Sequence, residues 1–100
     1  MEGKLVRDKI PEIIKADAKM PITHVADDTE YWEKLKNKMN EEISEFLETE
    51  SKEELADVLE VIYAVCDFMH FDKNELEEIR KKKAEEKGGF EKKIILDSVQ

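Results

Sequence analysis

The sequence has one cysteine, two prolines and three glycines among its 100 residues. The lone cysteine excludes a disulfide within the chain and is typical of a reducing compartment, so we expect a cytoplasmic protein. Because few residues favour turns, helices are favoured over a sheet with many hairpins. No apolar run approaches the roughly 18 residues of a membrane span, and the start lacks the apolar core of a signal peptide.

Positive charge is also in short supply, because 26 acidic residues stand against 17 basic ones and the net charge is −9. A negative surface repels phosphate backbones and anionic lipids, which argues against nucleic acid or a membrane as partner. The imbalance lies in residues 27–78, which carry 18 acidic and 5 basic groups. Residues 79–93 reverse it, with seven basic and three acidic groups.

Apolar periodicity and helix caps predict an all-α fold with four helices in a single domain, residues 1–100. Two further segments, residues 21–26 and 90–96, are β-branched or apolar and could pair as a small two-stranded β ribbon. The predicted helices are a short one within residues 4–18 with Pro11 in its first turn, 28–48 after Asp27, 52–70 after Ser51, and 73–87 between Asp72 and Gly88.

Carboxylates flank the turn expected near Thr49 and Glu50. On a helix, residues three apart are surface neighbours, so the acids pair on each side of the turn. An antiparallel hairpin of helices 28–48 and 52–70 then faces the two pairs toward each other. Four carboxylates would converge on one spot, with Glu42 opposite Asp57 and Glu45 opposite Glu54.

The second pair argues most strongly for a metal. At about 100° per residue, Glu54 and Asp57 fall on a helix wall that is otherwise apolar and has no lysine or arginine. Charged groups are rarely buried unless they are paired or bind metal. An all-oxygen set selects Mg²⁺, with Mn²⁺ and Ca²⁺ as alternatives, over Zn²⁺. Two explanations that need no metal stay open. Ser51-x-x-Glu54 is also a capping box, and the acids of residues 41–45 could form a solvated surface.

Magnesium held by carboxylates commonly serves a substrate phosphate, and two basic groups could hold its oxygens. For the second group, favourable charge at a helix C-terminus is an alternative explanation. Tyr31 or Trp32 could stack on a base, although Trp32 falls on the apolar stripe of its helix. The candidate substrate-binding residues are Lys4, Arg7 and Lys9 near the start, and Arg80, Lys83 and Lys87 near the end.

The pattern Glu-Glu-x-x-Glu at 41–45, followed by Glu-x-x-Asp at 54–57, resembles the signature of the all-α nucleoside triphosphate pyrophosphohydrolases. This MazG-like group includes phosphoribosyl-ATP pyrophosphatase. The segments 4–12 and 87–92 look like one house-cleaning branch of it. The resemblance implies a four-helix MazG-like bundle that hydrolyses an NTP or dNTP to the monophosphate and pyrophosphate with Mg²⁺.

One departure from the family leaves the substrate open. The eight residues between Glu45 and Glu54 are fewer than the family usually has between the two halves of the motif. The resemblance still implies, by position, a role for each acid. The implied metal ligands are Glu42, Glu45, Glu54 and Asp57, and the implied catalytic acids that could accept a proton are Glu41 and Glu45.

Two other functions compete with this one. Hydrolysis of phosphoribosyl-ATP in histidine synthesis would use the same chemistry on another substrate. A non-enzymatic helical assembly module is favoured by helix 52–70, which is apolar on most sides. The same helix predicts a homodimer or homotetramer, because a chain of this length has little with which to cover it.

Overall fold

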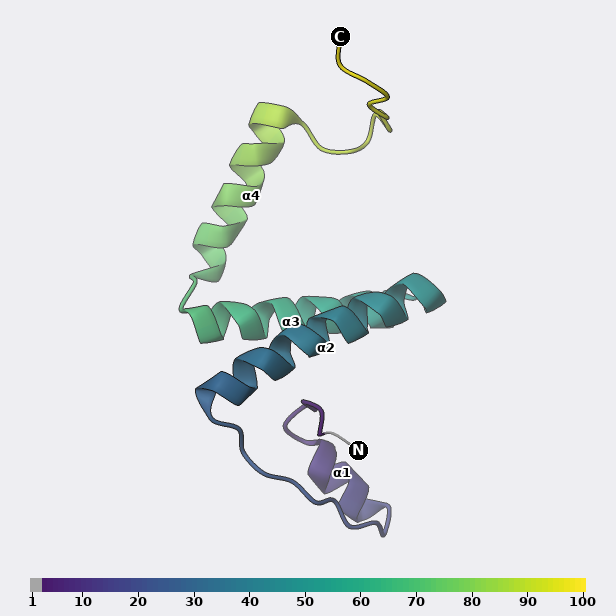
Figure 1. Cartoon of the computed structure of the whole chain (residues 1–100), viewed down its shortest axis with the longest axis vertical. Helices are drawn as coiled ribbons and strands as arrows, with labels where there is room; N and C mark the ends of the chain where they lie inside the picture. The colour runs from purple at the N-terminus through teal and green to yellow at the C-terminus, as the bar shows by residue number, and fades with distance from the viewer. Residues whose placement is uncertain (1–2) are drawn as a thin grey trace.

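The computed structural model describes residues 3–100, which contain four α-helices and no strand (Figure 1). This confirms the all-helical class predicted from the sequence. In chain order the helices are α1 (Ile10–Ala16), α2 (Asp28–Thr49), α3 (Lys52–Met69) and α4 (Lys73–Lys87).

The three longer helices begin where their cap residues predicted. A side-chain oxygen at each cap accepts a hydrogen bond from a backbone N–H of the first turn, which would otherwise lack a partner. The donor and acceptor pairs are Glu30 N to Asp27 Oδ1 at 2.9 Å, Glu54 N to Ser51 Oγ at 3.2 Å, and Glu75 N to Asp72 Oδ1 at 3.0 Å.

A two-residue connection joins α2 to α3. Glu50 has a left-handed backbone with φ of 54°, and its N–H donates to the Phe46 carbonyl at 2.7 Å. Ser51 then starts α3, which confirms the turn predicted near Thr49 and Glu50. This short connection places the end of α2 next to the start of α3, where the acids of the motif lie.

The expected β ribbon is wrong, since neither residues 21–26 nor residues 90–96 form a strand. In the first segment Ile22 and Val25 are each 98% exposed, so no neighbouring strand covers their side chains. In the second, Lys93 has a positive φ of 57° and donates to the Phe90 carbonyl at 3.1 Å, which forms a turn. A strand needs a partner for its backbone, and neither segment finds one here.

Helices α2 and α3 pack against each other and hold the small core (Figure 1). Leu35 of α2 and Cys66 of α3 are almost fully buried. The Trp32 ring stacks on Phe68 with centroids 5.5 Å apart and planes 3° from parallel. Trp32 therefore packs between the helices, as its place on the apolar stripe predicted.

The other two helices add little to this pair. Among residues 3–100, only α2 and α3 share an extensive interface, and α4 projects away from them (Figure 1). The chain measures 60 Å along its longest axis, and its radius of gyration of 18.0 Å exceeds the ~13 Å of a compact 100-residue domain. No helix in the described part of the chain is long and apolar enough to cross a membrane.

Candidate metal centre

The two halves of the acidic motif meet between α2 and α3. Carboxylate oxygens of Glu42, Glu54 and Asp57 lie within 4.8 Å of one another. A second group of Glu41, Glu42 and Glu45 has the same spacing. The four residues expected to bind metal therefore belong to two clusters that share Glu42.

Glu42 is the most buried charged residue in the described part of the chain, with 6% of its surface exposed. One of its oxygens, Oε2, is buried and has no hydrogen-bond partner among residues 3–100, and the same holds for Oε2 of Glu54. A buried carboxylate oxygen without a partner is costly. Two such oxygens in one cluster are the arrangement that a bound cation would satisfy.

The electrostatics of Glu45 reflect the crowding of like charges. The negative charge of Glu42 is the main cause that raises the pKa of Glu45, with partial burial and the charge of Glu54 adding to it. Proximity of a second carboxylate disfavours the ionised form. The cluster thus holds more negative charge than its own helices stabilise.

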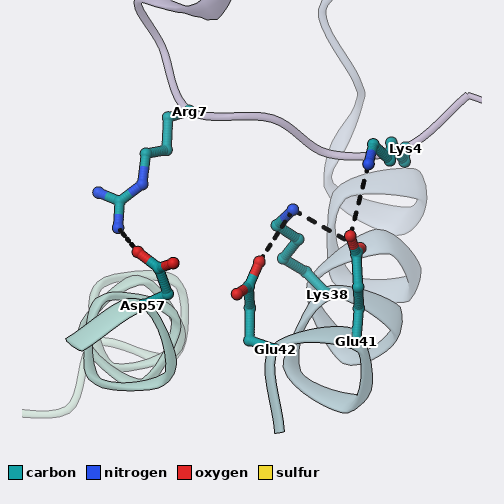
Figure 2. A network of polar contacts seen from close by, with 6 residues as sticks. All are labelled: Lys4, Arg7, Lys38, Glu41, Glu42 and Asp57. Carbon is teal, nitrogen blue, oxygen red and sulfur yellow. Dashed lines mark hydrogen bonds and ion pairs between the residues drawn. The ribbon is translucent and has the colours of Figure 1, made fainter. Parts of the chain in front are cut away.

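Three basic side chains offset part of this charge (Figure 2). Lys38 lies between two acids of its own helix, with Nζ 3.2 Å from Glu42 Oε1 and 3.6 Å from Glu41 Oε2. Lys4 contacts Glu41 at 3.4 Å. The remaining contact, between Arg7 and Asp57, joins the segment before α1 to α3 at 2.7 Å.

These basic side chains come from outside α3, so they leave unchanged the prediction that its acidic wall carries no lysine or arginine. The helical angles of α3 alone show no lysine or arginine on its acidic wall, but Lys38 reaches the cluster from α2 and Arg7 from the N-terminal segment. The contact of Lys38 with Glu42 follows from helical spacing, because the two residues are four apart on α2. Five carboxylates against three cations still leave negative charge in excess.

The cluster borders an open cleft of about 500 Å³. Glu42 and Asp57 line it from the two helices, and Tyr31 lines it from the start of α2. The segment of residues 5–9 forms its remaining wall and includes Arg7 and Lys9. The cleft therefore joins the acids to two of the basic residues predicted to bind phosphate.

The basic residues of α4 lie elsewhere. Arg80 hydrogen-bonds to Glu77 of its own helix through both Nε and Nη2. Neither Arg80, Lys83 nor Lys87 lines the cleft. Helix α4 projects away from α2 and α3 (Figure 1). Their predicted role in phosphate binding stays a prediction that requires α4 of a second copy, or a different placement of this helix.

The donor set fits a hard divalent cation. Mg²⁺ binds oxygen at about 2.1 Å, so two ligands on opposite sides of it lie ~4.2 Å apart. Oxygens of Glu42, Glu54 and Asp57 within 4.8 Å of one another approach this spacing and need only a small closure. Carboxylate oxygens also match the preference of Mg²⁺ and Mn²⁺.

The comparisons with known proteins leave the family open. No family model and no solved structure matches the chain. An uncharacterized protein of Mycolicibacterium smegmatis is 38% identical over 51 residues, which are 51% of this chain and 52% of the relative. The chain thus spans about half the length of the curated relative it matches, so the candidate site is argued from its own geometry.

Replacement of Lys38 by methionine should destabilise the metal-free protein by about 1–3 kcal/mol, because buried Glu42 would lose its ion-pair partner. Added Mg²⁺ should stabilise this variant more than the wild type, because the cation would neutralise the negative charge of Glu42 that Lys38 no longer offsets. Urea unfolding with and without Mg²⁺ measures both effects.

Lys81→Met, on the exposed surface of α4, is the control and should change stability by less than about 0.5 kcal/mol. Equal stability of Lys38→Met and the wild type would show that Glu42 does not depend on this lysine.

Proposed function

We propose that the protein is a Mg²⁺-dependent nucleoside triphosphate pyrophosphohydrolase that converts an NTP or dNTP to its monophosphate and pyrophosphate. The observation that carries the proposal is buried Glu42, which has an unpartnered oxygen and belongs to a carboxylate cluster contributed by two helices. In this proposal α2 and α3 form the antiparallel hairpin of a MazG-like bundle. The acidic signature and the segments 4–12 and 87–92 support the same family by resemblance.

The acids would divide the work of binding and proton transfer. Glu42, Glu54 and Asp57 would hold the cation, with Glu45 as a further ligand and Mn²⁺ as an alternative metal. A bound divalent ion supplies charge stabilisation on the phosphates and lowers the pKa of a coordinated water. Glu45 or Glu41 would accept the proton of the attacking water. Glu45 is favoured because its carboxylate lies in the same cluster as Glu42, beside the proposed metal.

The cleft would hold the rest of the nucleotide. Arg7 and Lys9 lie on its wall and present cations to phosphate oxygens. Tyr31 lines the cleft from α2, with its ring edge-on to Phe68 at a centroid distance of 5.5 Å, and would contact the base. Trp32 is committed to stacking on Phe68 and is the poorer candidate for base contact.

We also propose that the active form is a homodimer or homotetramer. The chain exposes 9317 Å², whereas a folded monomer of its mass exposes about 5900 Å². The excess of roughly 3400 Å² is larger than the ~800 Å² that each partner buries in a standard interface. Apolar side chains contribute to this excess, and a second copy of the chain would cover them.

A substrate panel tests the proposed reaction. We expect the pure protein to release pyrophosphate from at least one NTP or dNTP in the presence of Mg²⁺, and none in EDTA. Phosphoribosyl-ATP belongs in the same panel, because it would be split by the same chemistry. Hydrolysis of phosphoribosyl-ATP alone would place the protein in histidine synthesis, and no release from any substrate would leave the helical assembly module as the better account.

A further inference from the structure

The segment of residues 3–9, here called the N-terminal strap, lies across the acidic cluster (Figure 2). It brings Lys4 to Glu41 of α2 and Arg7 to Asp57 of α3, residues that are 37 and 50 positions away in the chain. The two ion pairs span both helices of the candidate metal centre. The strap is therefore placed to respond to whatever binds there.

The strap backbone has supports other than these ion pairs. Leu5 and Val6 are half-buried and line the cleft. The Arg7 carbonyl accepts a hydrogen bond from the N–H of Ile10 at 3.0 Å, which ties the strap to the first turn of α1. Breaking the contact between Arg7 and Asp57 would therefore release a side chain and leave the backbone in place.

The Arg7 side chain has the freedom to move. It is 56% exposed and makes a single contact with the cluster, from Nη2 to Asp57 Oδ1. The rest of its guanidinium has N–H donors to spare, and guanidinium matches phosphate geometry better than ammonium does. Lys38 differs, because it is 17% exposed and lies between two acids of its own helix.

We propose that Arg7 is a phosphate-positioning residue that a divalent cation releases from Asp57. The inference rests on the metal site proposed above. Asp57 is a predicted metal ligand, so a cation bound there competes with the guanidinium for the same carboxylate and repels it. The released guanidinium, still held at the cleft by the strap, then donates hydrogen bonds to a phosphate oxygen of the substrate.

The first arm of the test is Mn²⁺ binding, measured by isothermal titration calorimetry in the absence of any nucleotide. Arg7→Gln should bind Mn²⁺ about threefold to fivefold more tightly than the wild type, the size expected for loss of an exposed competing ion pair. Lys19→Gln is the matched control, because it removes one positive charge from a pair with Asp17 that lies outside the cleft. Its Mn²⁺ affinity should equal that of the wild type.

The second arm uses inorganic pyrophosphate as the probe, titrated into protein saturated with Mn²⁺. Arg7→Gln should bind pyrophosphate about tenfold more weakly, because a charge-assisted hydrogen bond is lost. Arg7→Lys should recover part of this affinity, since it keeps the charge but not the planar fork. Opposite changes in metal and pyrophosphate affinity are a result that a purely structural role for Arg7 would not give.

The outcomes separate this inference from the metal site itself. If the wild type binds no Mn²⁺ at millimolar concentration, the metal site and the inference both fail. If it binds Mn²⁺ but Arg7→Gln binds no more tightly, or if pyrophosphate affinity is unchanged, only the inference is overturned.

Discussion

Glu42→Gln is expected to abolish Mg²⁺-dependent pyrophosphate release and to weaken Mn²⁺ binding by about 100-fold or more. Loss of a residue that only supports a metal ligand already costs ~10- to 100-fold in affinity, and Glu42 belongs to both carboxylate clusters. The substitution keeps the shape of the side chain, removes its charge and replaces one carboxylate oxygen with an amide NH2. Calorimetry with Mn²⁺ and a pyrophosphate assay measure the two effects.

The same substitution should leave the metal-free protein as stable as the wild type, or make it more stable. Glu42 contributes a buried charge with one unpartnered oxygen, and Lys38 would retain Glu41 as a partner. Glu48→Gln is the matched control, since Glu48 is an exposed acid on the same helix and belongs to neither cluster. If Glu42→Gln and Glu48→Gln both bound Mn²⁺ as tightly as the wild type, the result would contradict the metal site.

Leu59→Asp is expected to convert the proposed oligomer to monomers at micromolar concentration. Leu55, Leu59 and Tyr63 are four residues apart on α3, so they form one stripe, and each is at least 41% exposed in the single chain. Burial of a leucine contributes about 1.5–3 kcal/mol, and an aspartate there would carry an uncompensated charge into the interface. The association constant should fall by about 100-fold or more.

Sedimentation velocity measures this change directly. Ile22→Asp is the control, because Ile22 is 98% exposed and lies outside the helices, and it should leave the mass of the oligomer unchanged. Circular dichroism shows whether Leu59→Asp keeps its helices as a monomer. A wild-type protein that is already monomeric at micromolar concentration would contradict the proposed oligomer.

The helices could be predicted from the sequence because their signals are local. Asp27, Ser51 and Asp72 each cap a helix through a backbone N–H three residues away, which no distant contact needs to support. The β ribbon failed for the opposite reason, since residues 21–26 and 90–96 would have needed each other. Their β-branched or apolar composition favours a strand but supplies no partner.

The sequence predicts which acids converge at the candidate site, but it does not predict the burial of Glu42 or the contact of Arg7 with Asp57. Spacing along two helices placed Glu42 near Asp57, but the burial of Glu42 depends on how closely α2 and α3 approach. The Arg7 contact joins residues 50 positions apart, so no local pattern reveals it. The position of α4 depends in the same way on tertiary contacts, so the sequence does not show whether its basic residues lie near the acids.

The most direct test of the central claim is ³¹P NMR of a reaction of the pure protein with its best nucleoside triphosphate and Mg²⁺. We predict signals of the monophosphate and of pyrophosphate in equal amounts, absent in EDTA and absent with Glu42→Gln. Formation of the diphosphate and orthophosphate would contradict the proposed reaction. Hydrolysis that proceeds equally in EDTA would contradict the metal site that the acids of α2 and α3 are proposed to form.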